Sequence, residues 1–595
     1  MKALLIYPTH DNCDEVVEPY LESGVDAACF PQRVTCDSGD RPQNCWNDDA
    51  SQAEGIGLSV VKTVCPACDY RDKCRQTGYL AQLVNVAHAD VAIATHKRAE
   101  YTGLSEMAQG RDYVSIHEDV IDLLRPPTDI STGDVVQARL LVQDYILNDP
   151  ASLNWFGDAT RVDDDGNFYQ DAELAIRRER IYEFFRLLSE LLENLHCAIE
   201  SAERTVDWMP PATATVPTGF ERALFFGIRR ARIRFGDQPW RFLLSAASGR
   251  IHLAAIIVEQ RFHKGGGQGN AYLKKSVVGV IDNPPPTNCV TWINDATATV
   301  AHVEAILGRP VLEATPQGQI ERRKKAVQIP RDITRRTSAK TVRGLIRGVM
   351  ADRPQFRRIG IIGHRTHMPV LKKLGTGFDE RIVKTSYFGS GEERSSNDWH
   401  HKCDLIIVAG TPRISLAAIA KYLVQIGEMS AATCEPEWGV IYWHGETESQ
   451  EPTKVNSRGY KNEAWRRAHQ DLVRAQIVQA TGRGRGILET GCEVLVLSDE
   501  ECGLPLSDTG VEILNDASVA ILNALSELTT ENPNKYILGK PVVSTGQLAE
   551  TTGLSRSRCR DLLRVLERRG LVQKIGERSG WRLVVYSAEE AAPCA

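Results

Sequence analysis

The sequence contains no apolar run long enough to cross a membrane, although the chain has 595 residues. Its first residues, MKALLIYPTH, lack the apolar core and cleavage site of a secretory signal peptide. We therefore expect a cytoplasmic protein without membrane contact. The sequence also lacks a strong basic excess, because its formal net charge is −6. Binding of a polyanion must then come from local basic patches.

A disulfide framework is also not expected, because 15 cysteines are spread over a long chain that we place in a reducing compartment. Three of them are close together: Cys65 and Cys68 form a Cys-x-x-Cys pair, and Cys74 follows shortly afterwards. Cys45 lies upstream as a fourth candidate ligand, and Cys36 is an alternative to it. Four thiolates hold either tetrahedral zinc or an iron-sulfur cluster, so the spacing predicts a metal site.

A third absence concerns the loop that holds nucleotide phosphates in many motor proteins. It reads Gly-x-x-x-x-Gly-Lys-Ser/Thr, because backbone N–H groups cradle the phosphates and the lysine bridges them. No Lys-Ser or Lys-Thr pair of this chain follows a glycine, and the pairs are Lys62-Thr63, Lys275-Ser276, Lys340-Thr341 and Lys384-Thr385. Nothing else in the sequence replaces this phosphate-binding loop.

Short apolar runs that are followed directly by polar residues indicate strands of an open α/β sheet, whose ligands lie at the carboxyl ends. We predict buried parallel strands at Lys2–Tyr7, Val91–Ala94, Tyr113–Ile116, Val290–Ile293, Ile359–Ile362, Leu405–Val408 and Val494–Leu497. Residues 36–80 are polar and Cys-rich and predict an irregular insertion, whereas residues 172–205 have the apolar spacing of a long amphipathic helix. Residues 221–241 contain six arginines and form a local basic stretch.

The polar residues that follow these predicted strands occur in an informative order. Taken together they resemble motifs Ia, II, III, IV, V and VI of superfamily 2 nucleic-acid helicases. The segments are Pro8-Thr9-His10, His117-Glu118-Asp119, Asp295-Ala296-Thr297-Ala298, Gly363-His364-Arg365, Gly410-Thr411-Pro412-Arg413 and Gln479-Ala-Thr-Gly482-Arg483-Gly484-Arg485.

The resemblance implies a role for each matching residue. Glu118 would orient the water that attacks ATP, and Gln479 with Arg483 or Arg485 would act at the γ-phosphate, with Arg483 as the arginine finger. Nucleic-acid contacts would come from Thr9, His10, Thr297, Gly410 and Thr411. The chain departs from the family at His117, which stands where the family has the aspartate that holds Mg²⁺, so binding of ATP and Mg²⁺ is left open.

The position of the cysteines extends the resemblance to iron-sulfur helicases of the nucleotide-excision-repair type. These carry four cysteines between motifs Ia and II, where this chain has Cys45, Cys65, Cys68 and Cys74. The resemblance therefore implies an iron-sulfur cluster, with zinc as the alternative. Two accounts of the missing phosphate loop stay open: an upstream polypeptide supplies it, or the motor is degenerate and only binds DNA.

The C-terminal residues predict a winged helix-turn-helix. A first helix at Val543–Thr552, a turn at Gly553-Leu554 and a second helix at Ser555–Arg569 precede a two-stranded wing with its tip at Gly576–Gly580. The second helix has a net charge of +4 and is expected to bind duplex DNA in the major groove, although winged helices that bind proteins are the alternative. Its candidate DNA-binding residues are Arg556, Arg558, Arg560 and Arg564.

We therefore predict an α/β protein with two RecA-like parallel-sheet domains, a Cys-rich insertion, a helical insertion and a winged helix domain. Its function would be ATP-coupled DNA unwinding or translocation if the phosphate loop is supplied, with single-stranded DNA at the motor and duplex DNA at the winged helix. The alternative is a non-catalytic DNA-binding protein. The expected divisions are a partial first RecA-like domain at 1–125 with its insertion at 36–80, a helical insertion at 126–245, a return to the first domain at 246–325, the second RecA-like domain at 326–503, a linker helix at 504–534 and the winged helix at 535–595.

Overall fold

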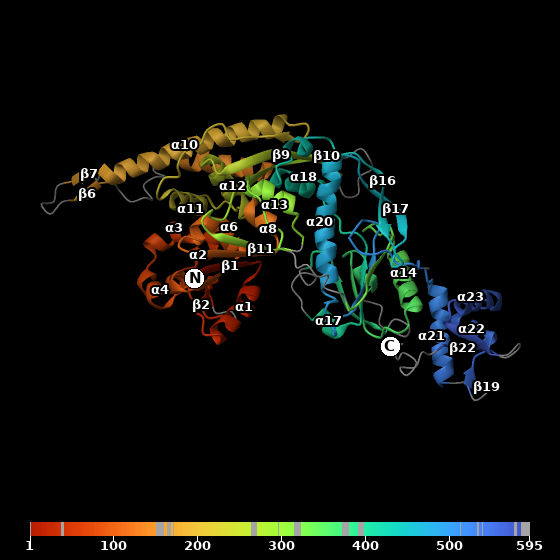
Figure 1. Cartoon of the computed structure of the whole chain (residues 1–595). Coiled ribbons are helices and arrows are strands. Elements are labelled where there is room, and N and C mark those ends of the chain that lie inside the picture. Colours follow the sequence, from red (N-terminus) through yellow and green to blue (C-terminus); the bar gives the residue numbers. More distant parts are fainter. Residues whose placement is uncertain are drawn as a thin grey trace. The chain divides into compact units, whose positions relative to one another are not determined.

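The computed structural model describes residues 2–584, with gaps at 37–40, 150–159, 163–167, 171, 263–270, 296, 315–322, 372–379, 391–397, 512, 532–534, 538–539 and 576–579. The chain divides into two compact units (Figure 1). Unit 1 contains residues 1–314 and 415–436, and unit 2 contains residues 315–414 and 437–595. Among the described helices, none is long and apolar enough to cross a membrane.

Unit 1 contains a parallel five-stranded sheet with the order β11-β4-β1-β3-β2. The three predicted N-terminal strands are confirmed within one residue, and their side chains are almost wholly buried because helices cover such sheets on both faces. The strands are β1 (Ala3–Tyr7), β2 (Ala27–Cys29), β3 (Val91–Thr95), β4 (Tyr113–His117) and β11 (Val290–Asn294).

The strand β11 is also where it was predicted, but it is not buried. It is the outermost described strand of the sheet, and its side chains alternate between exposed and half-buried. Val290 is 64% exposed and Trp292 is 44% exposed. The prediction that this apolar run is buried was therefore wrong, because an edge strand has a neighbouring strand on one side only.

Helices connect and cover these strands. Residues 36–80 were predicted to be irregular, but beyond the gap at 37–40 they contain four short helices. The elements are α1 (His10–Glu22), α2 (Asp49–Gly55), α3 (Val60–Thr63), η1 (Cys65–Ala67), α4 (Arg71–Thr77), α5 (Tyr79–His88), α6 (His96–Thr102), α7 (Leu104–Met107), α8 (Val120–Leu124) and α13 (Val300–Leu307).

A second layer of unit 1 combines helices with an antiparallel four-stranded sheet of order β5-β10-β9-β8. The predicted long helix is confirmed as α10 (Ala172–Ser201; Figure 1). The buried side chains of its apolar face belong to a large hydrophobic cluster of unit 1. The insertion thus contains strands as well as helices, and β11 is the later strand that joins the parallel sheet. The remaining elements are β5 (Pro127–Ser131), α9 (Thr132–Arg139), the π-helix η2 (Leu140–Leu147), β6 (Thr160–Val162), β7 (Phe168–Gln170), β8 (Val206–Asp207), α11 (Phe220–Ala231), α12 (Gln238–Ala247), β9 (Ile251–Phe262), β10 (Ala271–Ile281), α18 (Leu416–Gln425) and α19 (Met429–Ala432).

Unit 2 is built on another parallel five-stranded sheet, with the order β12-β18-β15-β13-β14. The predicted strands at Ile359, Leu405 and Val494 are confirmed. The elements of this part are β12 (Ala326–Ile329), α14 (Ala339–Asp352), β13 (Ile359–Gly363), α15 (Met368–Leu371), β14 (Ile382–Tyr387), α17 (Trp399–Lys402), β15 (Leu405–Ala409), β16 (Trp438–Glu446), β17 (Pro452–Tyr460), α20 (Glu463–Gly482) and β18 (Glu493–Leu497).

The C-terminal part of unit 2 has its own hydrophobic core. Side chains of α21 are buried there together with those of α22, α23 and the wing. This arrangement follows the predicted helix–turn–helix and adds α21 to it. The elements are α21 (Asp516–Glu531), β19 (Lys535–Ile537), β20 (Lys540–Val542), α22 (Thr545–Thr552), α23 (Arg556–Arg568), β21 (Val572–Ile575) and β22 (Gly580–Leu583).

Candidate nucleic-acid interface

The turn between α22 and α23 is fixed by local hydrogen bonds. Ser544 and Gln547 form a capping box at the start of α22, and Ser555 caps α23 by accepting a hydrogen bond from the N–H of Arg558 at 3.2 Å. Gly553 ends α22 in the left-handed region, with φ of 70°, which a residue with a side chain adopts at a cost. These caps set the angle at which α23 leaves the turn.

One face of α23 is buried and the opposite face is basic. Cys559, Leu562, Leu563 and Leu566 are buried in the core. Residues four apart lie along one strip of a helix, so the exposed Arg556, Arg560, Arg564 and Arg568 form a ladder, with Arg558 exposed beside it. In the part of the chain that the structure describes, no ion pair joins these five arginines to a carboxylate. The predicted DNA-binding arginines therefore lie on one accessible helix.

Arg569 does not belong to this ladder, although it was included in the net charge of +4 predicted for the second helix. Its side chain is 9% exposed, and its guanidinium lies 2.7 Å from a carboxylate oxygen of Asp352 on α14. It also donates a hydrogen bond to the carbonyl oxygen of Gly348 at 3.3 Å. This arginine therefore joins α23 to α14 and does not add to the exposed charge of α23.

The wing is a short antiparallel pair in which Val572 faces Leu583 and Lys574 faces Trp581. Trp581 is buried, and its backbone pairs with that of Val543, which ties the wing to the start of α22. Lys574 is exposed and can reach a phosphate. The predicted tip at residues 576–579 lies outside the described residues.

In unit 1, the carboxyl ends of β1, β3, β4 and β11 bring several polar side chains to one edge of the sheet, as expected for an open α/β sheet. Thr9 is exposed and caps α1 by accepting a hydrogen bond from the N–H of Asn12 at 3.2 Å. Next to it, the pKa of His10 is lowered, mainly by burial and then by Arg41. Both predicted contact residues are therefore at this edge.

The loop after β4 has an unusual backbone. Glu118 and Asp119 have φ of 60° and 43°, and two consecutive non-glycine residues in the left-handed region store strain. The ring of His117 stacks on that of Tyr7, with centroids 4.2 Å apart. Its carbonyl oxygen lies 2.9 Å from Nε2 of His96. Glu118 is exposed at the tip of this strained loop.

Both histidines are neutral at neutral pH, because burial lowers the pKa of His117 and of His96. His117 therefore brings no negative charge to the position where the helicase family has its magnesium-binding aspartate. The sequence did not single out His96 or Tyr7. The sequence could have indicated His96, since it lies within three residues of the end of a predicted strand, as His10 does.

The loop after β11 is held by one carboxylate. Oδ1 of Asp295 accepts hydrogen bonds from the backbone N–H and the hydroxyl of Thr297 at 2.8 and 2.7 Å, and Oδ2 accepts from the N–H of Val120 at 2.9 Å. The predicted contact residue Thr297 thus shapes its own loop through its hydroxyl. Asp295 joins the loop after β11 to the start of α8.

In unit 2, Gly410 and Thr411 lie at the carboxyl end of β15. Gly410 has φ of 108°, and a side chain there would approach His364 and the carbonyl of Ile333 to 2.8 Å, so glycine is required. The hydroxyl of Thr411 is 2.7 Å from that of Ser498, which follows the neighbouring strand β18. The predicted residues therefore belong to a packed polar edge.

The other predicted residues of unit 2 lie at the opposite edge of the same sheet. Gln479 is half-buried in the last turn of α20, and Arg483 and Arg485 follow that helix, as the motif predicts. The loop then returns to the amino end of β18, where the N–H of Cys492 donates to the carbonyl of Gly484 at 2.7 Å. A five-residue strand, roughly 13 Å long, separates this loop from Gly410.

The four predicted metal ligands lie near one another in unit 1. Burial raises the pKa of the Cys65 thiol, Arg33 lowers it, and the thiols of Cys45, Cys74 and Cys68 raise it further. Two of the sulfurs accept hydrogen bonds: Cys74 from the N–H of Leu80 at 3.4 Å, and Cys68 from the amide of Asn47 at 3.5 Å. Such bonds are typical of cluster-binding thiolates. Among the described residues, however, no three His, Cys, Asp or Glu side chains are close enough to hold one metal ion.

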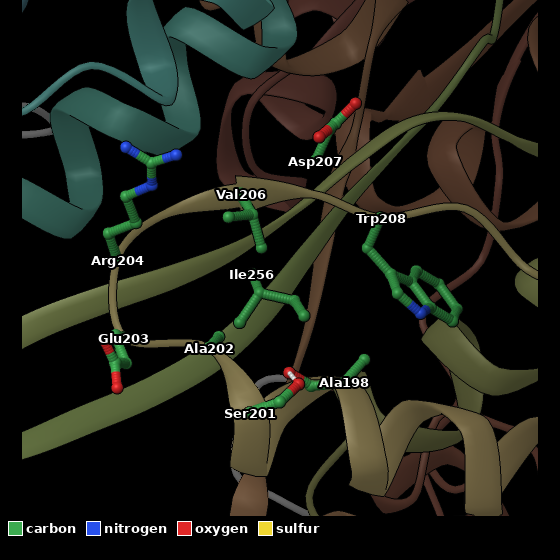
Figure 2. A pocket seen from close by; sticks show the side chains of 9 residues that line it. All are labelled: Ala198, Ser201, Ala202, Glu203, Arg204, Val206, Asp207, Trp208 and Ile256. Atoms are coloured by element: carbon green, nitrogen blue, oxygen red, sulfur yellow. Dashed lines mark hydrogen bonds between the residues drawn. The ribbon is translucent and has the colours of Figure 1, made fainter.

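Two further features of unit 1 combine positive and negative charge. In the basic stretch, Arg229, Arg230 and Arg241 form ion pairs with Asp49, Asp149 and Glu100. A hollow of about 580 Å³ lies between the end of α10 and β8 (Figure 2). Its lining residues include Glu203, Arg204 and Asp207, a mixture of charges without a clear preference for one ligand.

Comparison with known proteins addresses the C-terminal part. Residues 535–573 match the family of winged helix-turn-helix DNA-binding domains. The C-terminal domain is a winged helix-turn-helix DNA-binding domain. The match begins at β19, includes α22 and α23 and ends in β21, so it contains the arginine ladder of this winged helix. A search of curated protein sequences finds no match to the chain.

Proposed function

We propose that this chain binds duplex DNA through the winged helix, with α23 as the recognition helix in the major groove. The observation that carries the proposal is the ladder of exposed arginines on the second helix of a winged helix-turn-helix DNA-binding domain. A helix in the groove reads bases with a few side chains, while other basic residues hold the phosphates. The exposed Lys574 of the wing would contact the adjacent backbone.

The test is a titration of a labelled duplex with the full chain, followed by fluorescence anisotropy at several salt concentrations. Arg560→Ala and Arg564→Ala should each weaken binding, by roughly 1–3 kcal/mol where the arginine contacts a base. Where it contacts a phosphate, the slope of log K against log salt should fall by about one. Arg177→Ala on α10 removes the same charge from unit 1 and serves as the control. Unchanged binding and an unchanged salt slope in both ladder variants would refute the proposal.

We further propose that the two parallel sheets form a helicase-like motor that requires a phosphate-binding loop from a partner polypeptide. Support comes from the positions of the motif residues, since Thr9, Glu118 and Thr297 converge at one carboxyl edge. The open edge of β11, with Val290 and Trp292 exposed, is a place where a further parallel strand can add. A loop after such a strand would lie beside Thr297 and the strained Glu118.

In this proposal Arg483 acts as the arginine finger on ATP, with Gln479 and Arg485 beside it, while the motor contacts single-stranded DNA. The second candidate is a non-catalytic DNA-binding protein built on a degenerate motor. It is favoured by His117, whose burial keeps it neutral where a magnesium-binding carboxylate is needed. ATP hydrolysis stimulated by single-stranded DNA and lost in Arg483→Ala would support the motor. Absence of hydrolysis with a candidate phosphate-loop partner present would support the second candidate.

For the cysteines, we propose that Cys45, Cys65, Cys68 and Cys74 bind an iron-sulfur cluster, with zinc as the alternative. The support is the Cys-x-x-Cys spacing with Cys74 close behind it, and the N–H donors on the sulfurs of Cys68 and Cys74. When bound, the cluster would cross-link the short helices of this segment through four thiolates. Cys36, the alternative ligand, is exposed.

A further inference from the structure

From Val440 onward the hairpin of β16 and β17 in unit 2 packs on the unit with one face. Trp443, Val455 and Leu506 form a small buried cluster on that face. The indole N–H of Trp443 donates to the carbonyl of Asp499 at 2.9 Å, and the N–H of Leu506 donates to that of Glu446 at 2.8 Å. The hairpin is therefore held to the unit from beneath, and the position of its outer face is fixed.

That outer face carries a row of large apolar side chains from β16. Trp438 is 44% exposed, Val440 is 77% exposed and Tyr442 is 61% exposed. They are alternate residues of one strand and so point to the same side. At the open end of the hairpin, Trp438 also contacts the buried rings of Tyr460 and His469 and is therefore only partly exposed. Single exposed apolar residues are common on proteins, but an aligned group on a rigid hairpin marks an interaction surface.

The facing strand β17 adds positive charge to the same surface. Arg458 lies opposite Val440, and Lys454 lies opposite His444, so their side chains share the outer face. Nζ of Lys454 is 3.8 Å from the centre of the Tyr442 ring. The outer face of the hairpin thus combines aromatic surface with positive charge.

We propose that this outer face, formed by Trp438, Val440, Tyr442, Lys454 and Arg458, is a base-stacking surface for an extended single strand of nucleic acid. Aromatic rings stack on bases of any identity, and nearby cations bind the phosphates between them. The inference deepens the proposed nucleic-acid function, on which it rests for the class of ligand.

The exposed rings favour a single strand over a duplex. Trp438 and Tyr442 are four residues apart on one strand and therefore lie about 13.6 Å apart. Stacked bases in duplex DNA are about 3.4 Å apart along each strand and cover one another's faces. A nucleic-acid strand whose bases stack on Trp438 and Tyr442 must therefore be unstacked at those bases.

The test uses the full chain and fluorescein-labelled oligothymidine, measured by fluorescence anisotropy. Tyr442→Ala should weaken binding roughly 5- to 150-fold, which corresponds to the ~1–3 kcal/mol that one stacked base contributes. Tyr442→Phe keeps the ring and should bind like the unchanged protein. Because Tyr442 is exposed, neither change should alter thermal unfolding. Tyr145→Ala, at an exposed tyrosine of η2, is the matched control and should bind normally.

A parallel titration with duplex DNA separates this inference from the proposed function. Tyr442→Ala should leave duplex binding unchanged, whereas Arg560→Ala and Arg564→Ala should weaken duplex binding and spare oligothymidine. If Tyr442→Ala binds oligothymidine as tightly as Tyr442→Phe does, the stacking surface is refuted. If the ladder variants retain full duplex binding while Tyr442→Ala loses oligothymidine, the proposed duplex function fails and the stacking surface stands.

Discussion

The winged helix shares its core with α21, and this predicts which C-terminal fragment can fold alone. Helix α21 packs against α22, α23 and β22, and it contributes Val519, Ile521, Leu522 and Leu525, all of which are almost fully buried. The boundary expected from the sequence, at residue 535, would remove them. We predict that fragment 535–595 does not fold and that fragment 513–595 does.

The magnitude follows from the buried side chains. Burial of one Val, Leu or Ile side chain contributes roughly 1.5–3 kcal/mol, so the four residues contribute roughly 6–12 kcal/mol. A domain of fewer than about 80 residues has only about 3–5 kcal/mol of net stability. The free energy lost with α21 is therefore larger than the net stability of such a domain, so fragment 535–595 should be unfolded and should not bind DNA.

The assay is urea unfolding followed by far-ultraviolet circular dichroism, together with duplex titration of both fragments. Fragment 513–595 should unfold cooperatively, and Leu525→Ala within it should cost roughly 2–5 kcal/mol. Ile513→Ala changes an exposed apolar residue at the start of the fragment and should have little effect. Cooperative unfolding of fragment 535–595 at the same urea concentration would refute the reasoning.

Two further predictions concern a buried carboxylate and the cysteines. Burial raises the pKa of Glu500 to about 8, helped by Asp499, and lowers that of His469, 3.7 Å away, to about 4. Between about pH 4.5 and 6.5 the two groups nearly cancel, because folded protein protonates Glu500 where unfolded protein protonates His469. Between about pH 6.5 and 8 folded protein binds one more proton than unfolded protein, so its stability should fall as pH rises through this window, by at most about 2 kcal/mol. Glu500→Gln should flatten the profile above about pH 6.5, and parallel melting profiles of both proteins would contradict this. Anaerobically purified protein should be brown with about four irons per chain, and Cys68→Ser should lose iron; colourless protein with one zinc would overturn the iron assignment while keeping the ligands.

Much of the local structure was determined by the sequence itself. The strands at Ala3 and Tyr113, the long helix α10 and the turn at Gly553 all appeared within a few residues of their predicted positions. Apolar periodicity and capping residues act over only a few residues, so the sequence shows them directly. The same signals indicated which residues follow each strand, and hence that Thr9, Glu118 and Thr297 lie at strand ends.

The tertiary structure decided which of these residues meet and which face outward. Only the strand order places β11 beside β4, which joins Asp295 to Val120 and leaves Trp292 exposed. The tertiary structure also distinguishes two neighbouring arginines: Arg568 is exposed, whereas Arg569 is paired with Asp352. Contacts between distant segments depend on packing of the whole unit, and no local pattern encodes them.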